Sequence, residues 1–319
     1  MADQLVTLTE RAQRRIGTSL RKGKYVLDRL LGVGSTSAVF AATHRNGRSF
    51  AVKLLHPELS SVEELRTRFL RDAYAANRVR HPSVVPVLDD DVDEEDGSAF
   101  IVMDLLEGTT LATEWHESAR TLPLPRVVAI VHVVLDVLTA IHGQDIVHRD
   151  VRPANVFVTA DGLKLLDVGI GRLGDASRTM TGHAMDPSQF VAPEQAAGKT
   201  GEIDARTDLY SVGAMIFTLL TGHAVHRAST PTDTLRLAAT RHARSLKDVW
   251  PGAPSPIANF VDVALAFEKE KRWASAEEMR TALGHAVSLS AARGTPSPVA
   301  PVLGPTGTVV VGRKAKKRT

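Results

Sequence analysis

The amino-acid sequence predicts an α+β protein of two lobes, a small β-rich N-terminal lobe with one helix and a larger, mainly helical C-terminal lobe. Two observations support this prediction. Short strand-like runs separated by turn residues fill positions 25–104, whereas apolar residues recur at helical spacing after Gly108. The 319 residues are 43% hydrophobic and 24% charged, which is the composition of a globular chain long enough for two lobes.

In the N-terminal lobe, runs of β-branched, aromatic and small apolar residues predict four strands, with turns such as Asn46-Gly47 between them. We expect the strands at residues 25–27, 38–41, 50–54 and 100–103. Residues 62–80 predict the helix of this lobe. Its apolar face would consist of Leu65, Phe69, Ala73 and Ala76.

In the C-terminal lobe, four apolar stretches predict helices at residues 125–141, 207–221, 255–267 and 275–287. Pro125 stands near the start of the first helix and Gly222 follows the second, as is typical of helix ends.

We divide the chain into an N-terminal extension (1–18), an N-lobe (19–104), a C-lobe (105–288) and a flexible basic tail (289–319). The tail is predicted from its Gly, Pro, Ser and Thr content and its run of Lys and Arg at residues 313–318.

Composition also narrows the classes of partner and compartment. The chain has no cysteine, so disulfides and thiolate metal sites are excluded and a reducing compartment is expected. A net charge of +3 gives little support for nucleic-acid binding, and we expect no nucleic-acid partner. The first 15 residues do not form a signal peptide, and the longest apolar runs fall short of the ~20 residues of a membrane span. We therefore expect a cytoplasmic protein without a membrane anchor.

The acidic run at residues 89–96 suggests a calcium loop, but it lacks the glycine and the terminal glutamate of an EF-hand. An exposed hairpin loop between two strands is the preferred interpretation.

A glycine-rich turn at residues 31–39 lies between two predicted strands and could place backbone N–H groups over phosphates. Because a strand follows it rather than a helix, a dinucleotide-binding fold is disfavoured. Lys53 lies within the next apolar strand and is either solvent-exposed or held for an anion. A buried lysine needs a carboxylate. Asp72 is flanked by apolar helix positions, so we expect it to face inward and to be the partner of Lys53.

The strongest chemical signal is the segment 146–158. Asp150 can accept a hydroxyl proton, Arg152 can neutralise charge on a transferring phosphoryl group, and Asn155 offers an amide oxygen to Mg²⁺. Twelve residues after Asn155, Asp167 would be a second oxygen ligand. Each aspartate alone is compatible with a simple turn, but the ordered set points to phosphoryl transfer.

Together these segments resemble the motifs of protein kinases, from about residue 25 to residue 283, and are most similar to bacterial serine/threonine kinases of the eukaryotic-like (Hanks) type. The resemblance implies the bilobal protein-kinase fold and transfer of the γ-phosphoryl group of ATP to protein Ser or Thr hydroxyls. It implies that Lys53 holds the α/β-phosphates and that Asp150 is the catalytic base. Asn155 and Asp167 would hold Mg²⁺, or alternatively Mn²⁺. The Pro after Arg152 favours Ser/Thr over Tyr specificity.

The resemblance also implies a nucleotide pocket. Met103 would be the gatekeeper, and Asp104 to Leu106 the hinge that meets adenine. The remaining nucleotide-binding residues would be Leu31, Gly32, Gly34, Val39, Ala51, Phe157 and Asp72, with Leu31, Val39, Ala51 and Phe157 sandwiching the base.

Three further residues resemble structural positions of the family. Glu194, in Val191-Ala192-Pro193-Glu194, would end the activation segment and pair with Arg272. Asp208 would anchor the catalytic loop from a buried helix.

The chain departs from the family pattern at five positions. Asp72 stands for Glu and is one methylene shorter, Arg152 stands for Lys, and Val168 stands for Phe. Ser37 stands for a loop glycine. Pro187, or Ser188 if the loop shifts by one residue, stands where relatives have a Thr that contacts the catalytic Asp.

There are two alternatives to an active protein kinase. One is a pseudokinase that acts as a nucleotide-binding scaffold, and the other is a small-molecule phosphotransferase, which would not be expected to carry Glu194, Asp208 and Arg272 together. We expect regulation by autophosphorylation at Thr179 or Thr181, whose phosphate would pair with Arg149. Transfer in trans would involve a transient homodimer. The protein substrate cannot be named from the sequence.

Overall fold

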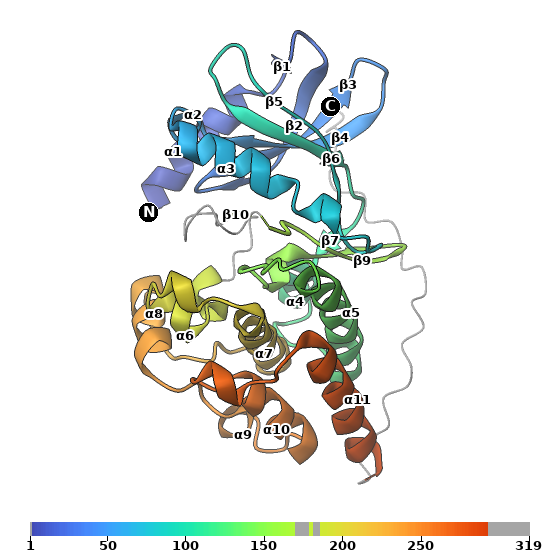
Figure 1. The fold of residues 1–319 in the computed structure, drawn as a ribbon, viewed down its shortest axis with the longest axis vertical. Helices are drawn as coiled ribbons and strands as arrows, with labels where there is room; N and C mark the ends of the chain where they lie inside the picture. The colour runs from blue at the N-terminus through green and yellow to red at the C-terminus, as the bar shows by residue number, and fades with distance from the viewer. Residues whose placement is uncertain (1, 170–178, 181–185, 293–319) are drawn as a thin grey trace, which may run out of the picture.

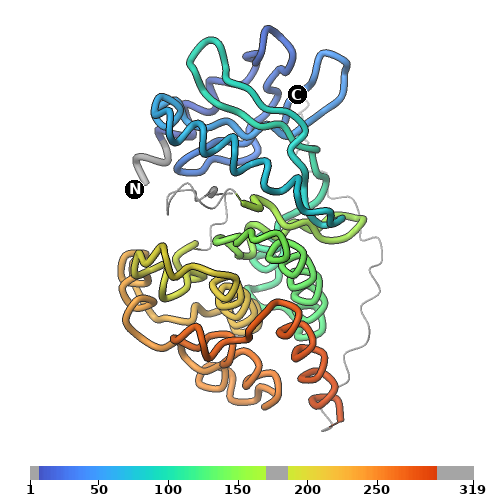
Figure 2. The backbone as a smooth tube through the Cα atoms, in the orientation of Figure 1, coloured from blue at the N-terminus to red at the C-terminus, as the bar shows by residue number. Residues whose placement is uncertain are grey.

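The structure is a computed structural model that describes residues 2–169, 179–180 and 186–292. It has the expected α+β architecture, with a β-rich N-lobe above a helical C-lobe (Figure 1). Figure 2 shows the chain passing from one lobe to the other after strand β6. The predictions of the fold class and of the order of the two lobes are therefore confirmed.

The N-lobe is built on one antiparallel sheet with the strand order β1-β2-β3-β4-β6-β5, to which β10 adds beside β2. Its strands are β1 (Ser19–Leu20), β2 (Tyr25–Gly34), β3 (Ser37–His44), β4 (Ser49–Leu55), β5 (Val87–Val92), β6 (Ala99–Asp104) and β10 (Thr179–Met180). Its helices are α1 (Ala2–Arg14), α2 (Pro57–Ser60) and α3 (Glu63–Ala73).

Alternation along the strands gives the sheet two apolar faces. In β6, Phe100 and Val102 belong to a cluster that includes Ala12 of α1, so the N-terminal segment is part of this lobe. Ala99 and Ile101 point the other way and pack with Phe69 of α3. The sheet is thus covered by α1 on one face and by α3 on the other.

Helix α3 is shorter than the sequence predicts. It ends at Ala73, and a short 3-10 turn, Ala76–Arg78, follows. The side chain of Asn77 explains the break. Its Nδ2 donates to the Val87 carbonyl and its Oδ1 accepts from the Val87 N–H, both at 2.8 Å. The amide therefore pairs with the start of β5 as a strand would, and this tertiary contact replaces further helix.

The acidic run at residues 89–96 also differs from the predicted hairpin loop. Its first three aspartates lie within β5, and the turn begins only after that strand. Lys24 Nζ lies 2.6 Å from Asp89, and Arg15 lies 2.6 Å from Asp93. Asp89 in β5 and Asp93 just after it therefore hold Lys24 and Arg15 at this end of the sheet, so the acidic run is not a loose loop.

The C-lobe is mainly helical, and a small sheet of β7, β8 and β9 faces the N-lobe. Its strands are β7 (Thr109–Thr110), β8 (Val156–Thr159) and β9 (Gly162–Leu165). Its helices are α4 (Leu111–Glu117), α5 (Leu124–His142), α6 (Pro193–Ala196), α7 (Ala205–Thr221), α8 (Pro231–Thr240), α9 (Leu246–Val249), α10 (Ser255–Ala264) and α11 (Ala276–Ala292). The four helices predicted from periodicity correspond to α5, α7, α10 and α11.

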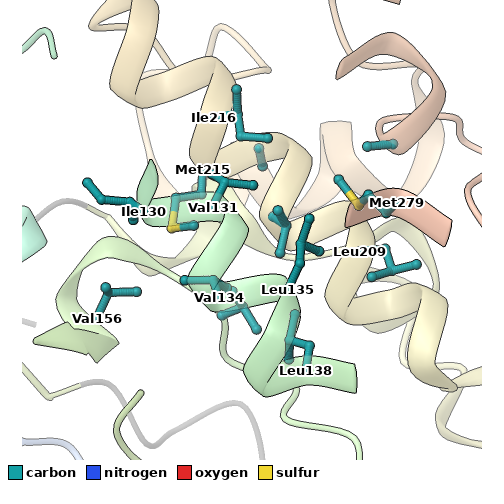
Figure 3. Packing of buried hydrophobic residues seen from close by; sticks show 14 of the residues in the cluster. Ile130, Val131, Val134, Leu135, Leu138, Val156, Leu209, Met215, Ile216 and Met279 are labelled. Atoms are coloured by element: carbon teal, nitrogen blue, oxygen red, sulfur yellow. The ribbon is translucent and has the colours of Figure 1, made fainter. Parts of the chain in front are cut away.

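The core of the C-lobe lies where α5, α7 and α11 meet (Figure 3). Leu135 of α5, Leu209 of α7 and Met279 of α11 are all fully buried there. Helix α7 ends at Gly222, whose φ of 75° is the left-handed conformation of a helix C-cap. By length and composition alone α5 could cross a membrane, but its buried residues form this core, so we interpret it as a core helix.

Candidate active site

A cavity of about 320 Å³ lies between the two lobes. Its roof comes from β2, β3 and β4, its floor from β8 and the residues that follow β9, and its back from α3 and β6. The predicted adenine sandwich is brought together here, because Leu31, Val39 and Ala51 line the roof and Phe157 lines the floor. Four apolar side chains on two opposite walls suit a planar heterocycle.

The predicted gatekeeper and hinge line the same cavity, namely Met103 and Asp104 to Leu106. The turn after them needs a glycine at position 108. Gly108 has a φ of 146°, and a Cβ there would lie 2.0 Å from the carbonyl oxygen of Val158. Only glycine therefore lets the hinge approach β8, although the sequence marked Gly108 merely as a boundary.

The glycine-rich turn is held by a side chain that sequence reasoning missed. Gly32 lines the cavity, whereas Gly34 does not. The Gly34 carbonyl instead lies 2.8 Å from the Nε2 of His56, a buried residue just after β4. Thr36 and Ser37 are buried as well, so the tip of the turn is tied to the sheet. Strand periodicity could not identify His56, because this residue comes after the end of β4.

Lys53 is directed into the cavity by strand alternation. It shares one face of β4 with Ala51 and Leu55, so it cannot reach solvent, and only 3% of it is exposed. Its Nζ lies 2.6 Å from Asp167 Oδ1. Burial opposes ionisation of Asp167, but Lys53 outweighs that effect and holds the pKa of Asp167 below its ordinary value.

The expected ion pair between Lys53 and Asp72 is wrong for this structure. The Asp72 carboxylate is buried, but its neighbours are Arg71 Nη2 at 3.3 Å and Arg68 Nε at 3.6 Å, both on α3 itself. Among the described side chains, Asp72 Oδ2 accepts no hydrogen bond. An aspartate is one methylene shorter than a glutamate, and Asp167 offers Lys53 a nearer carboxylate.

The catalytic loop, residues 146–155, connects α5 to β8 and is anchored from below by Asp208 of α7. This aspartate is fully buried. It accepts hydrogen bonds from the backbone N–H groups of His148 at 2.8 Å and Arg149 at 2.7 Å, and it lies 2.8 Å from His142 Nε2. The anchoring role predicted for Asp208 is therefore present in the structure.

Asp150, Arg152 and Asn155 form one hydrogen-bonded group at the rim of the cavity. The Asn155 Nδ2 donates to the Asp150 carboxylate at 2.8 Å, and the Arg152 Nε donates to it at 3.1 Å. Burial raises the pKa of the Asp150 carboxyl above its ordinary value, although Arg152 acts in the opposite direction. A carboxylate with a raised pKa is a better proton acceptor. The side chains of Asp150 and Arg152 do not line the cavity, whereas Asn155 and Asp167 do.

The donor set at this rim suits a hard divalent cation. The nitrogen of the Asn155 amide is used by Asp150, which directs the amide oxygen elsewhere. That oxygen and the carboxylate of Asp167 are the type of ligand that Mg²⁺ accepts, since Mg²⁺ completes its shell with phosphate oxygens and water. No group of three or more His, Asp or Glu side chains that could hold a metal ion occurs among the described residues, so an all-protein cage is not formed there.

The predicted pair of Glu194 and Arg272 is confirmed. Two N–H groups of Arg272 donate to the two oxygens of Glu194, each at 2.9 Å, and both side chains are buried. Ser188, the alternative to Pro187 at the threonine position of the family, has a different hydrogen-bond partner. Its hydroxyl donates to Asp186, and Asp186 caps the short turn Pro187–Phe190. Neither Pro187 nor Ser188 makes a side-chain hydrogen bond to Asp150 within the described part of the chain.

The regulatory prediction falls mostly outside the described residues. Thr181 lies outside them, and for Thr179 only the backbone is described, in β10 opposite Gly34 of β2. Arg149 has a left-handed backbone with a φ of 68°. Asp167 shares this conformation with a φ of 60°. Such strain is concentrated at functional sites.

Several cavity residues were not predicted as site residues. They are the apolar residues Ala73, Ala76, Val85, Val87 and Leu166, together with Val168, which the sequence marked only as a departure from the family pattern. Arg29 and Thr110 also line the cavity. Periodicity indicates that a position is buried, but it does not indicate which cavity that position lines.

A bilobal fold with a lysine, two aspartates and an asparagine around an interlobe cavity defines a nucleotide-dependent phosphotransferase site. The sequence profile of the family described as protein kinase domain matches residues 25–285, and the chain belongs to this family. It is 35% identical over 301 residues to a probable serine/threonine-protein kinase of Streptomyces coelicolor, covering 88% of this chain and 42% of the relative.

Other similarities agree. Serine/threonine-protein kinase PknH of Mycobacterium tuberculosis is 32% identical over 88% of this chain and 44% of its own length. The crystal structure of the M. tuberculosis PknI kinase domain superposes with a TM-score of 0.68 at 26% identity, over 86% of this chain and 98% of that domain. The chain thus spans about two fifths of the length of these curated relatives.

Proposed function

We propose that this protein is an ATP-dependent serine/threonine protein kinase that transfers the γ-phosphoryl group to Ser or Thr hydroxyls of proteins. The observation that carries the proposal is the arrangement at one end of the cavity. The buried Lys53 and the partly buried Asp167 form an ion pair there, and Asn155 joins the same rim to Asp150. A scaffold that only bound nucleotide would have no need of the group formed by Asp150, Arg152 and Asn155.

In this proposal each residue has a separate task. The hinge and the apolar walls hold adenine, and Lys53 holds the α/β-phosphates. Asp150 accepts the proton of the substrate hydroxyl while the new O–P bond forms and the bond from the γ-phosphorus to the bridging oxygen breaks, leaving ADP. Arg152, 3.1 Å from Asp150, keeps the carboxylate oriented and offsets negative charge.

Asn155 and Asp167 would hold the divalent metal. The metal would neutralise phosphate charge during transfer. We propose Mg²⁺, with Mn²⁺ as a substitute, because both prefer oxygen ligands. Comparing activity in each metal after chelation tests this choice, and the same activity in the chelator alone would contradict it.

The deciding experiment is transfer of labelled phosphate from ATP to the protein itself and to a generic protein substrate, with Mg²⁺ present. We expect transfer by the wild type and a loss of several orders of magnitude in Lys53→Ala and Asp150→Asn. Asp161→Asn is the matched control, because Asp161 lies in the exposed β8–β9 turn. ATP binding without any transfer by the wild type would favour the pseudokinase instead.

Regulation by phosphorylation at Thr179 or Thr181 stays a prediction. Transfer in trans would require a transient homodimer, so the initial rate of autophosphorylation should rise with the square of protein concentration. Unmodified Thr179 and Thr181 in a fully active sample would remove the idea. ATP as the phosphate donor supports a cytoplasmic location.

A further inference from the structure

Gln195 connects two parts of the active site that are far apart in the sequence. We call residues 186–192, which end at the alanine of the Ala-Pro-Glu motif, the docking segment. The Gln195 Nε2 donates to the Arg149 carbonyl at 2.9 Å, and its Oε1 accepts from the Ala192 N–H at 3.3 Å. A carbonyl can only accept and a backbone N–H can only donate, so this orientation of the amide satisfies both.

The peptide that Gln195 holds is the one that carries the catalytic base. The Arg149 carbonyl and the Asp150 N–H belong to the same peptide group. Arg149 is left-handed, with a φ of 68°, a conformation that is unfavourable for a residue with a side chain. Asp208 restrains the N–H of Arg149 and Gln195 restrains its carbonyl. The direction in which Asp150 leaves the backbone therefore depends on both restraints.

The other end of the connection is rigid. Glu194 precedes Gln195 in α6 and is held by the two hydrogen bonds from Arg272 and a third from the Thr207 hydroxyl at 2.7 Å. Ala192 is fully buried. The Ser188 hydroxyl, which is the nearest hydroxyl to the position where relatives have a threonine, is directed to Asp186. The described link from the docking segment to the base therefore runs through Gln195.

We propose that Gln195 is a positioning residue that sets the distance between a docked substrate hydroxyl and the Asp150 carboxylate. The proposal rests on the proposed kinase function and names one further residue that this reaction needs. The predicted nucleotide contacts lie in the cavity, which Gln195 does not line. Loss of the connection should therefore lower kcat and leave ATP affinity unchanged.

Two substitutions separate this role from a local helix cap. Gln195→Glu keeps an oxygen acceptor for the Ala192 N–H but cannot donate to the Arg149 carbonyl, whereas Gln195→Met removes both bonds at similar length. If Gln195 only capped α6, the Glu variant would behave like the wild type. We expect kcat on a protein substrate to fall about tenfold or more in both variants. Gln144→Glu and Gln144→Met are matched controls, because Gln144 is exposed just after α5.

A second readout does not require activity. Hydrogen–deuterium exchange of the amides at residues 147–157 should be faster in both Gln195 variants and unchanged in both Gln144 variants. Wild-type kcat and wild-type exchange in Gln195→Glu would overturn the proposal, as would a loss confined to Gln195→Met. If the wild type transfers no phosphate, the proposed function fails, and exchange in Gln195→Glu alone decides whether the connection holds the loop. Should the Met variant not fold, the Glu variant still decides.

Discussion

Removing Arg272 should cost a large part of the stability of the C-lobe. Its guanidinium is fully buried and makes five hydrogen bonds. Two go to Glu194, and the others go to the carbonyls of Ala266, Arg206 and Phe267. It also lies over the ring of Tyr210, with the guanidinium carbon 4.9 Å from the ring centroid.

In Arg272→Met, Glu194 would remain a buried carboxylate, and within the described ranges the Thr207 hydroxyl would be its one side-chain partner. Breaking a buried ion pair in this way costs about 3–5 kcal/mol. Because the whole chain is stabilised by about 5–15 kcal/mol, the variant should still fold but with a much lower urea midpoint. Tryptophan fluorescence during urea unfolding at neutral pH measures the difference.

The double variant Glu194→Gln/Arg272→Met tests the cause. It removes the buried charge, so it should recover part of the loss. A loss below about 1 kcal/mol in Arg272→Met, or no recovery in the double variant, would refute the reasoning.

The pH dependence of this pair has a definite sign. Burial opposes ionisation of Glu194, but the hydrogen bonds from Arg272 prevail and lower the pKa of Glu194 below its ordinary value of 4.5. The stabilisation is thus complete above about pH 4.5 and is lost as the pH falls through the lowered pKa. The difference in the free energy of unfolding between the wild type and Arg272→Met should therefore become smaller as the pH falls below about 4.5.

Three further changes test other parts of the structure. Burial lowers the pKa of His226 below its ordinary value of 6.5, so on acidification this histidine is protonated in the unfolded chain before it is protonated in the folded one. As the pH is lowered from about 6.5, the free energy of unfolding should therefore decrease in the wild type, and it should decrease less in His226→Gln. His56→Leu frees the Gly34 carbonyl and should weaken ATP binding by up to about tenfold, measured by titration calorimetry; unchanged affinity would show that this tether is dispensable. Gly169→Ala places a Cβ 2.7 Å from that of Ala75 at a φ of 82°, and should lower the free energy of unfolding by about 1–3 kcal/mol; unchanged stability would show that the segment after α3 moves away freely.

Local sequence patterns determined the elements of this fold. Alternation predicted β2, β3, β4 and β6, and helical spacing predicted α5, α7, α10 and α11, because each pattern depends on burial of one face. The order of the motifs was sufficient to predict that Asp150, Asn155 and Asp167 lie close together, because short connections join the catalytic loop to β8 and β9.

Contacts between distant segments were decided by the tertiary structure. The partner of Lys53 is Asp167 and not Asp72, because the reach of a carboxylate depends on where the backbone of α3 lies. The end of α3 depends on an amide contact to β5. No spacing rule connects His56 to Gly34.

Gln195 shows the same limit at the active site. Its position after Glu194 places it in α6, but its bond to the Arg149 carbonyl joins residues 46 positions apart in the chain. The sequence by itself determined that this chain carries the residues of phosphoryl transfer. Only the packing of α6 against the catalytic loop decided which side chain aligns them, because that alignment depends on distances of a few ångströms that no local pattern encodes.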